Sequence, residues 1–138
     1  LNRITALFFA RGISIDSIMS CETKKENEYV IFVELTYDWK VVGFICRLLK
    51  KLVDVIDVKD ITEEIHTETQ LTLVKVKCTN KESCLEHFNN FNVEVINEKD
   101  GKYYIEFANS KEKTAKFVKE LHKLGSVKYL KSGRMFLK

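Results

Sequence analysis

The spacing of apolar residues within 1–61 switches several times between helical and alternating, and this succession constrains the fold more than any other feature of the chain. The first segment has one apolar face at helical spacing, formed by Leu1, Ile4, Leu7 and Phe8. Residues that recur at this spacing predict an amphipathic helix. Arg11-Gly12 is expected to end it, because glycine takes up the left-handed conformation of a helix C-terminus without steric cost.

Two strands, a second helix and a third strand are predicted to follow within this half. Residues 13–17 alternate apolar and polar, as a strand with one buried face does. Residues 29–36 are the second predicted strand, and they come after a charged stretch at 22–28. The second helix has its apolar face at Val41, Ile45, Leu48 and Leu52. The third strand is predicted within residues 51–58, where it follows the helix almost without a loop.

Residues 70–138 repeat this succession with one more strand in front. The predicted elements are a strand at 70–78, a helix at 81–91, a hairpin of strands at 92–98 and 102–108, a helix after Ser110, and a strand at 127–130. Asp100-Gly101 is a strong signal for the hairpin turn. Between the halves, residues 62–69 are polar and acidic without glycine or proline, which indicates a short linker. The chain is therefore predicted to contain two copies of one plan.

The second predicted strand of the first half has apolar residues on both faces. One face carries Tyr29, Ile31, Val33 and Leu35, and the other carries Val30 and Phe32 beside Glu34 and Thr36. An apolar second face favours a buried partner surface, such as the matching face of a second copy. Ordinary exposed β-branched residues are the alternative, and the pattern leaves both open.

Charge is divided unequally between the two halves. Residues 1–69 contain 9 Lys and Arg against 12 Asp and Glu, a net charge of −3. Residues 70–138 contain 14 against 8, a net charge of +6. Two modules with different surfaces fit this division, and a solvated, lysine-rich helix over 111–123 is the simpler alternative. The overall net charge of +3 is too small to indicate nucleic-acid binding by itself.

The sequence lacks the motifs of common catalytic sites. It contains no glycine-rich phosphate loop, no GxSxG and no HExxH. Its histidines, His66, His87 and His122, lie on different predicted elements, and the carboxylates Asp54, Asp57 and Asp60 are interpreted as a solvated edge. The strand at 101–107 matches an RNA-binding strand only weakly, because Glu106 stands in its middle. No apolar run approaches the roughly 20 residues needed to cross a bilayer.

The cysteines Cys21, Cys46, Cys78 and Cys84 form no CxxC pair. They are expected to be reduced and to pack as small hydrophobic residues in a cytoplasmic protein. Cys78 and Cys84 with His87 raise the alternative of a metal site. Their spacing matches no zinc pattern, so no metal is predicted.

Several segments, in the same order, resemble the small regulatory subunit of acetolactate synthase (acetohydroxyacid synthase). The matching segments are Leu1-Asn2-Arg3-Ile4, Leu7-Phe8, residues 11–17, residues 51–56, residues 63–68 and residues 71–76. The resemblance covers about the first 77 residues, fades after Cys78 and returns faintly at residues 131–134.

This resemblance implies an α+β chain of two ferredoxin-like βαββαβ domains in tandem. The first is an ACT domain over residues 1–61, residues 62–69 are the linker, and residues 70–138 are the C-terminal domain. Family members have a short strand and an Asn-x-x-Gly turn before the first helix. Neither is present here, so the ACT domain is expected to lack its first strand and to be N-terminally incomplete.

The implied function is that of a non-catalytic regulatory subunit in branched-chain amino-acid biosynthesis. It would form homodimers through its ACT domains, activate the catalytic large subunit and confer feedback inhibition by valine. Thiamine diphosphate, Mg and FAD would belong to that catalytic partner, and no cofactor is expected on this chain. A free-standing amino-acid sensor and a metal- or nucleic-acid-binding ferredoxin-like protein are the alternatives.

The resemblance also implies where valine would bind. A zwitterionic amino acid needs N–H donors for its carboxylate, acceptors for its ammonium group and an apolar socket, and the start of a helix has free N–H groups. The residues matched to the family site are Leu1, Asn2, Ser14, Ile15, Asp16 and Cys21. Ser14 stands where the family usually has Asn. As alternatives, Ser14 is a plain strand residue and Leu1 and Ile15 belong to the core.

Overall fold

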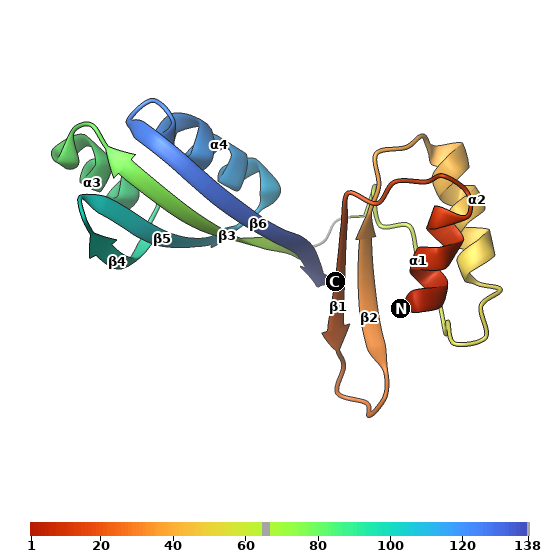
Figure 1. The fold of residues 1–138 in the computed structure, drawn as a ribbon. Coiled ribbons are helices and arrows are strands. Elements are labelled where there is room, and N and C mark those ends of the chain that lie inside the picture. The colour runs from red at the N-terminus through yellow and green to blue at the C-terminus, as the bar shows by residue number, and fades with distance from the viewer. Residues whose placement is uncertain (65–66, 138) are drawn as a thin grey trace. The chain divides into compact units, whose positions relative to one another are not determined.

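The computed structural model describes residues 1–64 and 67–137, which form two compact units. Unit 1 comprises the described residues up to 64, and unit 2 those from 67 (Figure 1). The elements of unit 1 are α1 (Asn2–Phe9), β1 (Ser17–Glu22), β2 (Tyr29–Glu34) and α2 (Trp39–Leu49). Those of unit 2 are β3 (Thr67–Cys78), α3 (Lys81–Asn90), β4 (Glu94–Lys99), β5 (Lys102–Asn109), α4 (Lys111–Leu121) and β6 (Gly125–Leu137). The α+β prediction is confirmed.

Unit 1 has a small core between its two helices and a two-stranded sheet. Strands β1 and β2 pair antiparallel, with Ile18 opposite Val33. The buried residues are Phe8, Ile45 and Leu49, and Val33 packs against them. Helix α2 begins at a good N-cap, because the carboxylate of Asp38 accepts hydrogen bonds from the first free N–H groups of the helix. The apolar faces of both helices thus pack into one core.

The predicted third strand of unit 1 is wrong. Residues 51–55 form a turn after α2, with the Val55 N–H donating to the Leu52 carbonyl at 3.0 Å, and residues 55–60 have no regular structure. A strand needs a neighbour that accepts and donates its backbone hydrogen bonds. Among the described strands of unit 1, only β1 and β2 pair, so no strand lies beside this segment. Its Val53 and Ile56 are largely exposed.

The first predicted strand of unit 1 is displaced along the chain. It was predicted at residues 13–17, and the ladder runs instead from Ser17 to Glu22. The alternation at 13–17 reports burial rather than pairing, because Ile13 and Ile15 pack against the core without belonging to a strand. Pairing begins only where β2 lies opposite, at Ser17 and Glu34.

Unit 2 follows the order β-α-β-β-α-β, and its sheet has the strand order β4-β5-β3-β6 with every neighbouring pair antiparallel. Alternate residues of the two central strands face the helices, so Val74 and Ile105 are buried. They meet Phe88 of α3 and Phe117 of α4 in one core. The rings of Phe107 and Phe117 lie 4.6 Å apart. Both helices therefore cover one face of the sheet, and the other face carries neither helix.

The prediction of reduced cysteines is wrong for Cys78 and Cys84, which form a disulfide. Cys78 ends β3 and Cys84 lies in α3, and the turn between them holds their Cα atoms 6.3 Å apart, within the range that a disulfide spans. Sequence spacing could not show this, because the distance depends on how tightly the strand turns into the helix. Cys21 and Cys46 are free.

No helix of the described residues is long and apolar enough to cross a membrane. Within the same residues, no group of three or more His, Cys, Asp or Glu side chains is arranged to hold a metal ion. His66 and part of the predicted linker 62–69 lie outside the described residues.

Candidate functional site

A cleft of about 940 Å³ opens in unit 1 between the start of α1, strand β2 and residues 52–61. Leu1 and Asn2 line it, as do Ile31 of β2 and Val58 of the irregular segment. The Arg3 guanidinium donates to the Asp54 carboxylate at 2.8 Å on the cleft lining. Both side chains of this pair are well exposed, so it contributes little stability.

The cleft lies along the unpaired edge of β2. Strand β2 pairs with β1 on one side, and no other described strand of unit 1 pairs with it. Residues 29–33 of β2 line the cleft, and residues 54–59 of the irregular segment line it too. A strand edge without a neighbour presents backbone N–H and C=O groups that can pair with another extended segment. The cleft thus offers both backbone and apolar contacts.

The start of α1 leaves donors available at this cleft. Leu1 is the N-cap, and it provides no side-chain hydrogen bond to the helix. The first N–H groups of an α-helix have no partner inside the helix and carry the positive end of its dipole. Leu1 and Asn2 both line the cleft, and their assignment to a valine site stays a prediction.

The other predicted ligand residues lie elsewhere on unit 1 and do not line the cleft. The backbone N–H of Ser14 donates to the Tyr37 hydroxyl at 3.0 Å. The Asp16 carboxylate accepts from the Thr36 hydroxyl at 2.7 Å. Ile15 packs against the core, as its alternative interpretation held. Within one chain, then, the six residues do not surround one cavity.

Cys21 lies on β1 opposite Val30, as a half-buried free thiol. Side chains of directly opposed residues share a sheet face, so Cys21 and Val30 lie on the face that also holds Met19 and Phe32. Val33, which packs against the core, lies on the other face. The partly apolar second face predicted from the sequence is therefore made by both strands of this sheet.

The titratable groups considered as catalytic candidates have structural partners. His87 is buried, and its Nε2 lies 3.3 Å from the Phe117 carbonyl oxygen. Its ring stacks on the Phe117 ring at 5.2 Å. Asp54 pairs with Arg3, Asp57 lies 3.9 Å from the Lys50 ammonium, and Asp60 accepts from the Thr62 N–H. These contacts give each of the residues a structural role, so no catalytic role is needed to explain them.

Among the described residues, Cys46 and Lys81 have shifted pKa values. Burial raises the pKa of the Cys46 thiol, and the Asp60 carboxylate adds to this shift. The hydrogen bond to Glu98 raises the pKa of the exposed Lys81 ammonium. A raised thiol pKa lowers the thiolate fraction, so Cys46 has the opposite of the environment that makes cysteines reactive.

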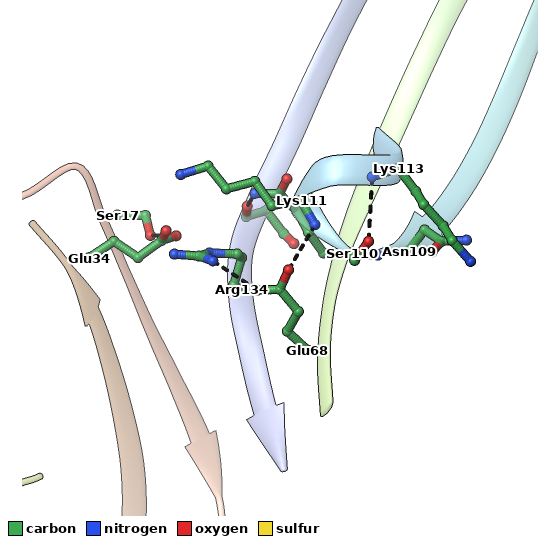
Figure 2. A network of polar contacts seen from close by, with 10 residues as sticks. Ser17, Glu34, Glu68, Asn109, Ser110, Lys111, Lys113 and Arg134 are labelled. Carbon is green, nitrogen blue, oxygen red and sulfur yellow. Dashed lines mark hydrogen bonds and ion pairs between the residues drawn. The ribbon is translucent and has the colours of Figure 1, made fainter. Parts of the chain in front are cut away.

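Sequence reasoning missed a polar cluster in unit 2 that Figure 2 shows around Glu68. One carboxylate oxygen of Glu68 accepts from the Lys111 N–H at 3.1 Å, and the other accepts from Arg134 at 2.8 Å. Glu68 therefore ties the start of β3 to the N-terminus of α4 and to β6. The family resemblance was the signal, because its segments at residues 63–68 and 131–134 include Glu68 and Arg134.

Comparison with known proteins identifies the family. The sequence profile described as "Small subunit of acetolactate synthase" matches residues 69–138, half of the chain. The chain belongs to this family. Small subunits of acetolactate synthase are non-catalytic and regulatory, with a role in branched-chain amino-acid biosynthesis. The match lies in the half where the sequence resemblance was weaker.

Individual relatives extend the likeness along the chain. The probable acetolactate synthase small subunit of Archaeoglobus fulgidus is 25% identical over 137 residues, covering 98% of this chain and 86% of the relative. The small subunit of Buchnera aphidicola subsp. Baizongia pistaciae is 34% identical over 79 residues, 57% of this chain and 50% of the relative. The crystal structure of the small subunit from Thermotoga maritima has a TM-score of 0.83, at 23% identity, over 99% of this chain and 86% of that one. The last likeness supports the fold.

Proposed function

We propose that this chain activates the catalytic large subunit of acetolactate synthase and makes it sensitive to valine. Family membership carries the first part, because a regulatory small subunit acts on a catalytic partner. The resemblance of the first half to the family supports the second part. In this proposal thiamine diphosphate, Mg and FAD belong to the catalytic partner. The complex of the two subunits is proposed to be cytoplasmic.

In this proposal each unit is a ferredoxin-like domain, and unit 1 is an ACT domain without its first strand. The strand order of unit 2, with its central strands β3 and β5, is that of the ferredoxin-like plan. In that plan the first strand pairs with the third and the fourth. The corresponding space in unit 1 is the cleft between β2 and residues 54–58. A strand placed there would give the irregular segment a partner, which explains why it is not a strand here.

The valine site in this proposal is shared between two copies of unit 1. The free N–H groups at Leu1 and Asn2 would bind the carboxylate. Ser14, Ile15 and Asp16 do not line the cleft of the same chain, so a second copy would supply them. We assign the contact to the partly apolar second face of the β1–β2 sheet, which carries Met19 and Cys21. Valine bound more tightly to one arrangement of the dimer would shift the population of active catalytic subunits.

The deciding experiment measures acetolactate synthase activity of the cognate catalytic subunit, alone and with this chain, with and without valine. Activation with valine inhibition is the expected result. Activation without a valine response would support the assignment as a regulatory subunit and would overturn the proposed valine site. No effect from a folded, dimeric chain that still binds valine would favour a free-standing amino-acid sensor instead.

A matched pair of variants tests the site. Asp16→Ala removes a carboxylate assigned to the valine site, and Glu26→Ala removes an exposed carboxylate of unit 1 that does not line the cleft. The first should raise the valine concentration needed for half inhibition by about tenfold or more, as losing a hydrogen bond to a charged group does. The second should leave it within about twofold. Equal effects would contradict the assignment of Asp16.

A further inference from the structure

The face of the unit 2 sheet that carries neither helix has lysines at one end and leucines at the other. Opposed residues in neighbouring strands share a face, so the register assigns this face row by row. One row across β4, β5 and β3 is Lys99, Lys102 and Lys77. The next row places Tyr104 and Lys128 on either side of Lys75. We refer to these residues, with the apolar ones described next, as the open face.

The other end of the open face has apolar residues on β3 and β6, and Glu106 and Glu94 lie in the same row on β5 and β4. Leu73 lies opposite Leu130 of β6, and Leu71 lies opposite Ala108 of β5. Leu73 is 47% exposed and Leu130 is 76% exposed, so neither contributes to the core. An apolar cluster beside a charged one, on a rigid sheet, is typical of an interaction surface.

The lysines of the open face are arranged at an electrostatic cost. Like charges directly opposite in a sheet are destabilising, and Lys102 has a lysine on each side. Within the part of the chain that the structure describes, none of the five is in an ion pair, and Lys75 instead lies over the Tyr104 ring at 5.3 Å. An arrangement that is unfavourable in the free chain becomes favourable when carboxylates lie opposite it.

We propose that the open face of unit 2 binds an acidic protein surface with an apolar centre, and that this surface belongs to the catalytic large subunit. The second clause rests on the proposed function. The five lysines would meet carboxylates of the partner, and the leucines would be buried against its apolar centre.

Size and charge both argue against a second copy as the occupant. Four strands about 4.8 Å apart and four rows about 6.7 Å apart cover roughly 500 Å². A stable interface needs about 800 Å² per partner. A two-fold contact joins the same patch on both copies, so the five lysines of each copy would meet lysines, leucines or, at most, the carboxylates of Glu94 and Glu106. A flat patch on a larger heterologous interface avoids both problems.

RNA is the less suitable partner for the same face. Single-stranded RNA is bound by stacking its bases on aromatic rings along a strand. Tyr104 is the aromatic residue in the lysine rows of the open face. The end away from the lysines consists of aliphatic side chains and of the carboxylates of Glu94 and Glu106, which lie opposite each other. Phosphates would be repelled there.

Charge reversal in pairs tests the proposal on the full chain. The test pair is Lys77→Glu with Lys128→Glu, which puts each new carboxylate opposite a lysine, Lys102 or Lys75. Such opposite-charge pairs stabilise a sheet, so the variant should fold at least as well as the parent. The matched control is Lys119→Glu with Lys123→Glu, two exposed lysines in and just after α4 with the same change in net charge.

The measurement is the Kd for the catalytic large subunit at two salt concentrations, with the melting temperature and sedimentation of each variant. The test pair should weaken binding by about tenfold or more and reduce its salt dependence, and the control pair should change it by less than about threefold. Equal effects of the two pairs would overturn the proposal. A change of self-association in the test pair alone would also overturn it, in favour of a second copy.

A second comparison tests the apolar end and separates this proposal from the proposed function. Leu130→Ser changes an apolar residue of the open face that is 76% exposed, and Val53→Ser changes an apolar residue in a turn of unit 1 that is 90% exposed. Only the first should weaken binding, and no difference between them would count against the open face. If the parent chain neither binds nor activates the catalytic subunit, the proposed function and this inference both fail. If it does both and the variants match it, only the inference fails.

Discussion

Units 1 and 2 are of similar length but differ in how much core they build. Unit 2 buries a cluster of ten residues under a four-stranded sheet, and unit 1 buries three under a two-stranded one. The helices are comparable, since each unit has two with an apolar face. The difference therefore lies in the sheet. A two-stranded sheet covers less apolar surface than a four-stranded one, so we expect unit 1 to be the less stable unit.

The largest predicted effect uses one substitution in both cores. Phe117→Ala and Phe8→Ala each remove a ring that is at most 1% exposed, and each should cost about 3–5 kcal/mol. Unit 2 has a full core and should remain folded with a lower free energy of unfolding. Unit 1 has little stability to lose, so Phe8→Ala should unfold it and leave unit 2 intact.

Native-state hydrogen exchange, measured by mass spectrometry on peptides from each unit, distinguishes these outcomes. Phe9→Ala is the control, because Phe9 adjoins Phe8 and is 88% exposed. It should change the free energy of unfolding by no more than about 0.5 kcal/mol. Retained protection of unit 1 in Phe8→Ala would contradict the claim that this unit is the weaker one.

Much of unit 2 was predictable from the sequence, for a reason that the two units illustrate. All of its strands and their partners lie within the chain, so the alternation at 70–78 and the Asp100-Gly101 turn produce the elements they predict. In unit 1 the same kind of pattern failed at residues 51–58. An alternating or apolar pattern records which side is buried, whereas a strand also requires a neighbour. The pattern was informative about burial, but no described strand of unit 1 pairs with this segment.

The candidate site was predictable only in part. The likeness to the family indicated Leu1 and Asn2, and the structure places both at the cleft. The likeness could not show that Ser14 and Asp16 lie away from that cleft. Their positions depend on hydrogen bonds to Tyr37 and Thr36, which are distant in the sequence. The disulfide and the Glu68 cluster also join residues by distances that spacing does not encode.

The disulfide gives the next largest effect, and it should be confined to unit 2. Reduction by dithiothreitol opens a short loop, which removes roughly 2 kcal/mol in the chain-entropy account. Hydrogen exchange of β3 and α3 should therefore quicken after reduction. Unit 1 should be unchanged, because Cys21 and Cys46 are free. In a variant with Cys78→Ala and Cys84→Ala, hydrogen exchange should be as fast as in the reduced chain and should not change with dithiothreitol. A change with dithiothreitol in that variant would contradict the assignment of the effect to this disulfide.

Glycine-to-alanine changes of opposite sign sharpen the comparison further. A Cβ on Gly125 would meet the Lys77 carbonyl group within van der Waals distance, because β3 and β6 pair closely there. Gly125→Ala should cost unit 2 about 1–3 kcal/mol. Gly43 lies inside α2, and its nearest neighbour would be the Arg47 side chain at 3.8 Å. Gly43→Ala should stabilise unit 1 by about 0.5–1 kcal/mol. Thermal and urea unfolding of both variants, measured separately for each unit, would give these changes in the free energy of unfolding. A lower stability of unit 1 in Gly43→Ala would reveal a clash that the open surroundings do not predict.

The smallest effect concerns the thiol of Cys46, which reports on the irregular segment of unit 1. Burial and Asp60 raise its pKa, so the thiolate fraction at pH 8 is lower than in the unfolded chain. Alkylation by iodoacetamide should be slower in the folded chain than in urea, and its rate should go on rising with pH after the unfolded thiol is fully ionised. Asp60→Asn should recover part of this difference, because it removes the negative charge and leaves the burial. Equal rates in the folded and unfolded chains would mean that residues 51–60 do not hold Asp60 near Cys46, and unit 1 would then be even less ordered relative to unit 2 than its small core implies.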